Sequence, residues 1–198
     1  MMVYFTSTHL MIGLFALAIA LIALWKKNKS YSYLFFFAIF WLYMMAVISV
    51  VVFPFYVPEK LSEFSSKLDI NLMPFNFGSC FDYLAALCFR SIYENILLTV
   101  PFGFGVNFIA CINPKRIIWL AILVGLTFET AQLVIMLIFH GSFRSVDIND
   151  AILNATGVLV GYGIFRVFGV VYSFIIHKFQ QQPRHIFASI YDVVRDQN

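Results

Sequence analysis

Five long apolar segments dominate this sequence and restrict the chain to folds that use lipid as a solvent. They run from Thr6 to Trp25, from Ser32 to Phe55, from Glu94 to Ile112, from Ile117 to Phe139 and from Asp150 to His177. A helix needs about 20 mostly apolar residues to cross the roughly 30 Å hydrocarbon core of a bilayer. Each segment is close to this length or exceeds it. The sequence therefore predicts an all-α membrane protein with five transmembrane helices.

Composition excludes the other broad classes. The 198 residues are 62% hydrophobic and 12% charged, whereas a soluble domain carries roughly 25% charged residues. A water-soluble globule or a disordered chain is not compatible with these values. The net charge of +3 is too small to indicate binding to nucleic acid.

The positions of the charged residues predict the orientation of the five helices. Lys and Arg accumulate on the cytoplasmic side of membrane proteins. In the arrangement with the amino terminus outside and the carboxyl terminus inside, the cytoplasmic face carries Lys26, Lys27, Lys29, Lys115, Arg116, Arg166, Lys178, Arg184 and Arg195. Most acidic residues then lie outside. Because the first basic cluster follows the first apolar run, we expect that run to remain as a membrane helix and not to be a cleaved signal peptide.

The same pattern divides the chain into four parts. Residues 1–55 are two amino-terminal transmembrane helices, 56–93 an extracytoplasmic amphipathic segment, 94–178 a three-helix core with the polar motifs, and 179–198 a cytoplasmic tail. Two short interfacial helices are expected outside the spans, because apolar residues recur there at helical spacing. One carries Leu61, Phe64 and Leu68, and the other carries Ile186, Ile190, Val193 and Val194.

Polar side chains within the apolar segments are the candidate functional residues, because such groups are costly in a membrane and tend to face a protein interior or a wet cavity. The candidates are Asn95, Glu129, Gln132, Arg144, Asp147, Asp150 and Asn154. Glu129 is expected near the bilayer midplane, with Gln132 on the same helix face. Asp147, Asp150 and Asn154 form one stripe at i, i+3 and i+7. In the predicted topology the set lies in the outer half of the membrane or near its midplane.

Structural roles compete with functional ones for several of these residues. Asp147 also fits the N-cap of the last helix, with Asp150 in its first turn. Arg144 also fits an ordinary loop cation or a partner of Asp147, and Gln132 fits a hydrogen bond between helices. Gly157 and Gly161, four residues apart, favour close approach of the last helix to a neighbour. Pro101 is expected to kink its helix.

Ordered motifs give the second half of the chain a family resemblance. They are Asn71-Leu-Met-Pro-Phe75, Asn95-Ile-Leu-Leu-Thr-Val-Pro-Phe-Gly103, Glu129-Thr-Ala-Gln132 and Arg144-Ser-Val-Asp147-Ile-Asn-Asp150, followed by Asn154, Gly157 and Gly161. In order and spacing the chain resembles the VanZ-like family of bacterial membrane proteins. The motif residues with a structural role in this comparison are Asn71, Pro74, Pro101, Gly103, Gly157 and Gly161. The resemblance implies a multi-pass protein of the Gram-positive cytoplasmic membrane, whose founding relative lowers susceptibility to teicoplanin-type glycopeptides.

The function favoured at this point is binding. An outward-facing polar cavity would recognise a lipid-linked cell-wall precursor or the lipid anchor of a lipoglycopeptide, with Arg144 as a bidentate phosphate ligand. Membrane lipids are the expected partners, and no cofactor is expected for this role.

An enzyme is the main alternative. Glu129 would be its general acid or base, and Asp147 and Asp150, with or without Glu129, would hold magnesium or calcium, because these ions prefer oxygen ligands. A structural adaptor of envelope proteins comes next, and proton-coupled transport comes last, because the inner half of the membrane carries few polar residues. Whether a reaction is catalysed stays open from sequence.

Overall fold

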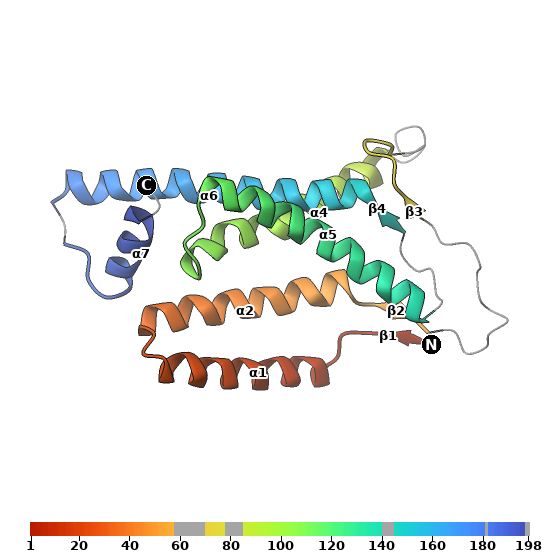
Figure 1. The fold of residues 1–198 in the computed structure, drawn as a ribbon, viewed down its shortest axis with the longest axis horizontal. Helices are drawn as coiled ribbons and strands as arrows, with labels where there is room; N and C mark the ends of the chain where they lie inside the picture. The colour runs from red at the N-terminus through yellow and green to blue at the C-terminus, as the bar shows by residue number, and fades with distance from the viewer. Residues whose placement is uncertain (58–69, 78–84, 140–144, 181, 197–198) are drawn as a thin grey trace.

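A computed structural model describes residues 1–57, 70–77, 85–139, 145–180 and 182–196. Figure 1 shows the arrangement of its elements. The helices are α1 (Ser7–Lys26), α2 (Tyr31–Val51), α4 (Ala85–Gly105), α5 (Pro114–Phe139), α6 (Ile148–Lys178) and α7 (Ile186–Arg195), with a 3-10 turn η2 (Val106–Phe108) after α4. The strands are β1 (Met2–Val3), β2 (Phe55–Tyr56), β3 (Ile70–Asn71) and β4 (Val146–Asp147).

The long helices confirm the prediction of an all-α membrane protein. α1, α2, α5 and α6 are long and apolar enough to cross a bilayer. α4, the remaining expected span, has 21 residues, but its first turns carry Arg90 and Glu94, which lower its apolar character. The count of five crossings and the orientation with the amino terminus outside therefore stay predictions. α2 ends before Pro54 because proline has no backbone N–H to continue a helix.

The connections between helices gather at two ends of the molecule (Figure 1). At one end, here called the strand end, β1 pairs antiparallel with β2, and β3 pairs parallel with β4. The opposite end carries the α1–α2 and α4–α5 connections and the carboxyl-terminal α7. The strand end corresponds to the side that the sequence analysis predicts to be outside.

Glycines bring α4 and α6 into close contact. A Cβ at Gly157 would overlap the Ile96 carbonyl oxygen, and a Cβ at Gly161 would overlap that of Val100. On α4, a Cβ at Gly103 would overlap the Val158 carbonyl oxygen. The two backbones thus touch along several turns, which is the close approach expected from the spacing of Gly157 and Gly161.

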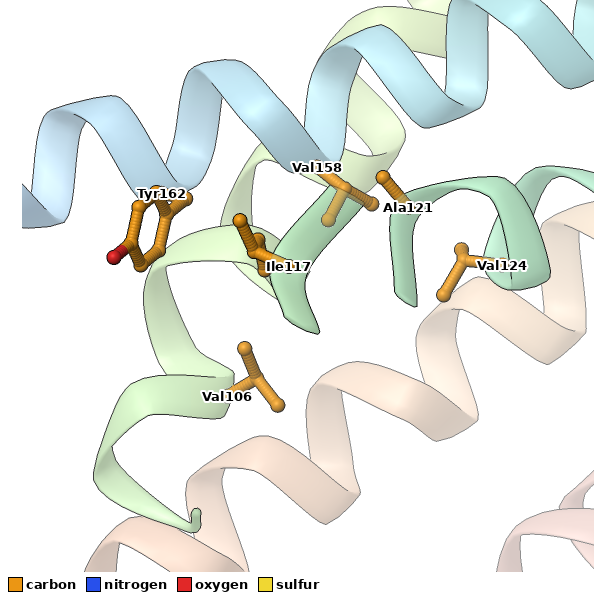
Figure 2. Close-up of a cluster of buried hydrophobic side chains, with 6 residues drawn as sticks. All are labelled: Val106, Ile117, Ala121, Val124, Val158 and Tyr162. Carbon is orange, nitrogen blue, oxygen red and sulfur yellow. The ribbon is translucent and has the colours of Figure 1, made fainter. Parts of the chain in front are cut away.

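An apolar cluster holds η2, α5 and α6 together (Figure 2). Its buried members are Val106, Ile117, Ala121, Val124, Val158 and Tyr162. On α6, Val158 is fully buried, and on α5, Ala121 is 1% exposed. This packing holds α5 against α6 and η2.

The carboxyl-terminal helix α7 forms where the sequence predicts an interfacial helix, but its apolar stripe packs against other parts of the protein. Val194 is 2% exposed and packs with Phe108 and Phe165, while Ile190 and Val193 pack around this cluster. α6 continues as a helix through Arg166, so this residue does not split the last segment. With 31 residues, α6 is about 46 Å long, which exceeds the roughly 30 Å hydrocarbon core. The other expected interfacial helix, with Leu61, Phe64 and Leu68, lies outside the described residues.

Candidate functional site

The polar end of α4 begins earlier than the sequence analysis expects. The predicted span begins at Glu94, whereas the helix begins at Ala85 and includes an Arg90–Glu94 ion pair with Nε and Oε1 2.7 Å apart. The i,i+4 spacing supports helix in these exposed turns. Asn95 therefore lies well inside α4, and its side-chain amide donates to Asp150 Oδ1 of α6 at 2.7 Å.

A polar cleft opens beside this hydrogen bond. It encloses about 840 Å³ and is lined by Val50, Arg90, Ser91, Glu94, Asn95, Leu97, Leu98, Gln132, Ser145 and Asp150. Three predicted site residues, Asn95, Gln132 and Asp150, thus come together here. Gln132 is half-buried and makes no hydrogen bond within the part of the chain that the structure describes, so its amide is available to a ligand.

A second polar cluster caps the start of α6. Asp147 is the N-cap residue, and its Oδ1 accepts hydrogen bonds from the backbone N–H and the side-chain amide of Asn149, both at 2.8 Å. Asp150 lies in the first turn. A carboxylate at this position satisfies backbone donors that have no partner within the helix. The structure therefore shows the capping role that competes with a ligand role for Asp147.

The Asn71 motif docks onto this cap. Asn71 donates to Asp147 Oδ2 at 3.1 Å, and the Asn149 side chain accepts from the backbone N–H of Phe75 at 2.5 Å and donates to the Asn76 carbonyl at 3.0 Å. We call Asn71, Asp147 and Asn149 the asparagine clasp. Pro74 follows Met73, whose carbonyl accepts from Asn76 N–H at 3.3 Å across a turn.

Backbone conformation at Phe75 shows that the clasp constrains this turn. Phe75 has φ of 62°, a region that glycine favours in this type of turn. Its backbone N–H is held by Asn149, which is 2% exposed. The side chain of Phe75 is 77% exposed, so the turn depends on its polar backbone contacts and not on burial of its apolar residues.

Glu129 belongs to the clasp region. It is 6% exposed, and its Oε2 accepts from the backbone N–H of Asp147 at 3.0 Å. Because Asp147 caps α6, Glu129 lies level with the first turn of that helix. Its expected position near the bilayer midplane, which follows from its distance of about 18 Å from Ile117 along the helix, stays a prediction.

Asn154 lies deeper, against α4. It is 2% exposed, and its backbone carbonyl accepts from the Thr99 hydroxyl at 2.7 Å. Nearby, the Tyr43 hydroxyl of α2 donates to the Leu98 carbonyl at 2.6 Å. The neighbouring Leu97 carbonyl has no helical donor, because Pro101 lacks the backbone N–H that would bond to it. The backbone of Asn154 therefore joins α6 to α4, and Asn154 is absent from the lining of the cleft.

The predicted polar set is thus divided. Asn95, Gln132 and Asp150 meet in the cleft, Glu129 and Asp147 meet at the clasp, and Asn154 faces Thr99. Arg144 lies outside the described residues. Across the described ranges, no three His, Cys, Asp or Glu side chains form a group suited to a metal ion. Because Asp147 already accepts from Asn149 and Asn71, the expected set of Glu129, Asp147 and Asp150 is not assembled as one cation site.

Sequence reasoning missed three residues that shape the site. Asn149 lies off the stripe that contains Asp147 and Asp150, and its partners Phe75 and Asn76 are more than 70 residues away in sequence. Arg90 and Glu94 were assigned to the segment before the span or to its edge, although their i,i+4 spacing is a helix signal.

Comparison with known proteins identifies one family. The sequence profile described as VanZ/LLP1 matches residues 40–169, which includes the clasp, the cleft and the close contact between α4 and α6. No curated protein and no solved structure matches the chain.

Proposed function

Because the chain belongs to the VanZ/LLP1 family and is a multi-pass membrane protein, we propose that its cleft recognises the polar head of a lipid-anchored molecule of the bacterial cell envelope. The candidates are a lipid-linked cell-wall precursor and a lipoglycopeptide antibiotic of the teicoplanin type. Both are amphiphiles with sugar, amide and ionised groups. In this proposal the strand end faces outward from the cytoplasmic membrane of a Gram-positive bacterium.

The polar cleft is the observation that carries the proposal. Two further grooves, of about 500 and 510 Å³, are lined almost entirely by apolar side chains, whereas the cleft is lined by charged, amide and hydroxyl groups. Polar groups beside membrane spans are costly unless they bind each other, water or a ligand. A large polar cleft on an otherwise apolar protein is therefore suited to a polar head group.

The chemistry of the lining fits such a head. Asn95 and Gln132 provide amides that donate and accept hydrogen bonds, and Ser91 adds a hydroxyl group. Arg90 and Glu94 provide opposite charges for an ionised ligand. Arg144 directly precedes the lining residue Ser145 in sequence and is proposed as the phosphate ligand.

Mass spectrometry of lipids that stay bound during purification tests the proposal. We expect one or a few lipid species to be enriched on the wild-type protein relative to the membrane extract, and to be lost from Gln132→Ala and Arg144→Ala. Thr127→Ala is the matched control, since the hydroxyl of this exposed residue donates to the Leu123 carbonyl of its own helix. An unchanged lipid profile in both Gln132→Ala and Arg144→Ala would exclude head-group recognition by the cleft.

A second experiment distinguishes the two candidate ligands, the envelope lipid and the antibiotic. Teicoplanin is titrated onto the purified protein, and its antibacterial potency is measured in a Gram-positive host with and without the gene. Direct binding that Gln132→Ala weakens, together with reduced potency, identifies the antibiotic. Enrichment of a cell-wall precursor without teicoplanin binding identifies the envelope lipid instead.

A further inference from the structure

An apolar groove lies along α2 and α4, and its lining residue Tyr43 donates a hydrogen bond to Leu98, which lines the polar cleft. It encloses about 510 Å³, and its lining includes Phe36, Ile39 and Tyr43 of α2, Pro101 and Phe104 of α4, and Ile164 of α6. Ile39 is 50% exposed and Ile164 is 48% exposed. These large apolar side chains are therefore accessible from the membrane and not buried in the protein core.

One face of α4 lines both the cleft and the groove. Arg90, Glu94 and Leu97 line the cleft, and Pro101 and Phe104 line the groove. Their spacings of four, three, four and three residues place all five on one side of the helix. Polar character therefore gives way to apolar character along a single face.

α2 shows the same continuity on the other side of the crevice. Val50 lines the cleft. Tyr43 lies seven residues before Val50, Phe36 lies seven residues before Tyr43, and both line the groove. The Tyr43 hydroxyl donates to the Leu98 carbonyl at 2.6 Å. Because this bond satisfies the polar tip of Tyr43, its ring is left as apolar lining where the two compartments meet.

From this continuity we infer that the groove holds a hydrocarbon chain of the same molecule whose head occupies the cleft. The inference rests on the proposed function and adds a binding site for the lipid tail. A polar compartment followed by an apolar one, on one face and within membrane helices, suits an amphiphile. Burial of each methylene against protein that fits it also adds dispersion contacts.

The other apolar groove is the natural contrast. It lies between α1 and α2, where its lining includes Phe5, His9, Trp41 and Met45. It does not share the face of α4 that carries Arg90 and Glu94. We therefore assign it to bulk membrane lipid, without a preferred head group.

Photo-crosslinking in native membranes tests the inference. Benzoylphenylalanine is incorporated at Ile39, about 16 Å along α2 from Val50 at the cleft, so that it samples the tail and not the head. The matched control carries it at Leu123 of α5, which is 61% exposed and absent from the lining of the groove. Both positions lie within candidate membrane spans, about 12 Å and 14 Å along the helix from the first residues of α2 and α5.

The masses of the lipid adducts give the result. We expect the Ile39 position to capture one or a few species enriched at least about fivefold over their share at Leu123, which corresponds to about 1 kcal/mol of selectivity. Equal distributions at the two positions would overturn the inference, because they would show only surrounding bulk lipid in the groove.

Repeating the Ile39 experiment with Gln132→Ala separates this inference from the proposed function. Loss of the enriched species supports a single molecule that spans cleft and groove. Persistence of the same enriched species would contradict the inferred link and the head-group role of Gln132, while leaving a lipid site in the groove. Enrichment in the purification experiment without enrichment at Ile39 would retain the proposed function and reject the groove.

Discussion

The asparagine clasp and the polar cleft lie side by side at the start of α6, yet they use their polar groups differently. Clasp residues bond within the protein: Asp147 accepts from Asn71 and Asn149, and Asn149 holds the backbone at Phe75. The cleft also contains bonds within the protein, from Asn95 to Asp150 and from Arg90 to Glu94, but it presents these groups around an open volume of about 840 Å³. Asp147 and Asp150, three residues apart, belong to different regions.

This difference shows how polar residues of one helix stripe can acquire separate roles. Buried polar groups need partners, and loss of one partner leaves the other at a cost of about 1–3 kcal/mol. Groups that line an open cleft can exchange a ligand for water at much lower cost. We therefore expect clasp substitutions to change stability and cleft substitutions to change binding.

The substitution with the largest expected effect should disrupt both the clasp and the cleft. Gly161→Ala places a Cβ against the Val100 carbonyl oxygen, so α4 and α6 must separate, at a cost of about 3 kcal/mol of unfolding free energy. Gly163→Ala is the control, because nothing lies within 4 Å of its Cβ position, and it should be neutral or slightly stabilising. Unfolding in mixed detergent micelles measures both, and equal stability of the two variants would contradict the close α4–α6 contact.

Removal of the Asn149 side chain from the clasp should have the second largest effect on stability. Asn149→Ala leaves the Phe75 N–H without its side-chain acceptor and removes one of the two amides that donate to the Asn76 carbonyl, the other being that of Asn71. This loss should lower the free energy of unfolding by about 2 kcal/mol. Thr156→Ala is a matched control on α6, since its exposed hydroxyl bonds to Ile152 of the same helix. A change below about 0.5 kcal/mol for Asn149→Ala, within the usual range of surface substitutions, would show that the clasp is not a structural unit.

A pair of substitutions at Glu129 tests whether this residue belongs with the clasp. Glu129→Gln keeps an oxygen that can accept from the Asp147 backbone N–H, and should change stability by less than about 1 kcal/mol. Glu129→Leu removes the acceptor and should cost about 1.5 kcal/mol. Bound-lipid profiles like that of the wild type are expected for Glu129→Gln, and loss of the enriched lipid in this variant would move Glu129 to the ligand site.

The smallest effect on stability is expected in the cleft. Gln132→Ala removes no hydrogen bond within the described chain, so its free energy of unfolding should stay within about 0.5 kcal/mol of the wild type. The enriched lipid should nevertheless be lost. A destabilisation comparable to that of Asn149→Ala would remove the distinction between the two regions.

The sequence predicted the helical class, the start of α6 to within two residues and the close approach at Gly157 and Gly161, because these follow from local spacing and hydrophobicity. The stripe of Asp147, Asp150 and Asn154 was also visible. The different partners of these three residues could not be predicted, since the partners depend on how β3 docks beside β4 and how α4 crosses α6. Asn149 was missed for this reason, because no local pattern distinguishes it from an ordinary residue of a first helical turn.

The most direct test measures unfolding free energy and retained lipid on the same two variants, Asn149→Ala and Gln132→Ala. We predict that Asn149→Ala lowers stability by about 2 kcal/mol while its folded fraction still carries the enriched lipid, and that Gln132→Ala loses the lipid at unchanged stability. Loss of stability and lipid in parallel in both variants would contradict the division between a structural clasp and a ligand-binding cleft.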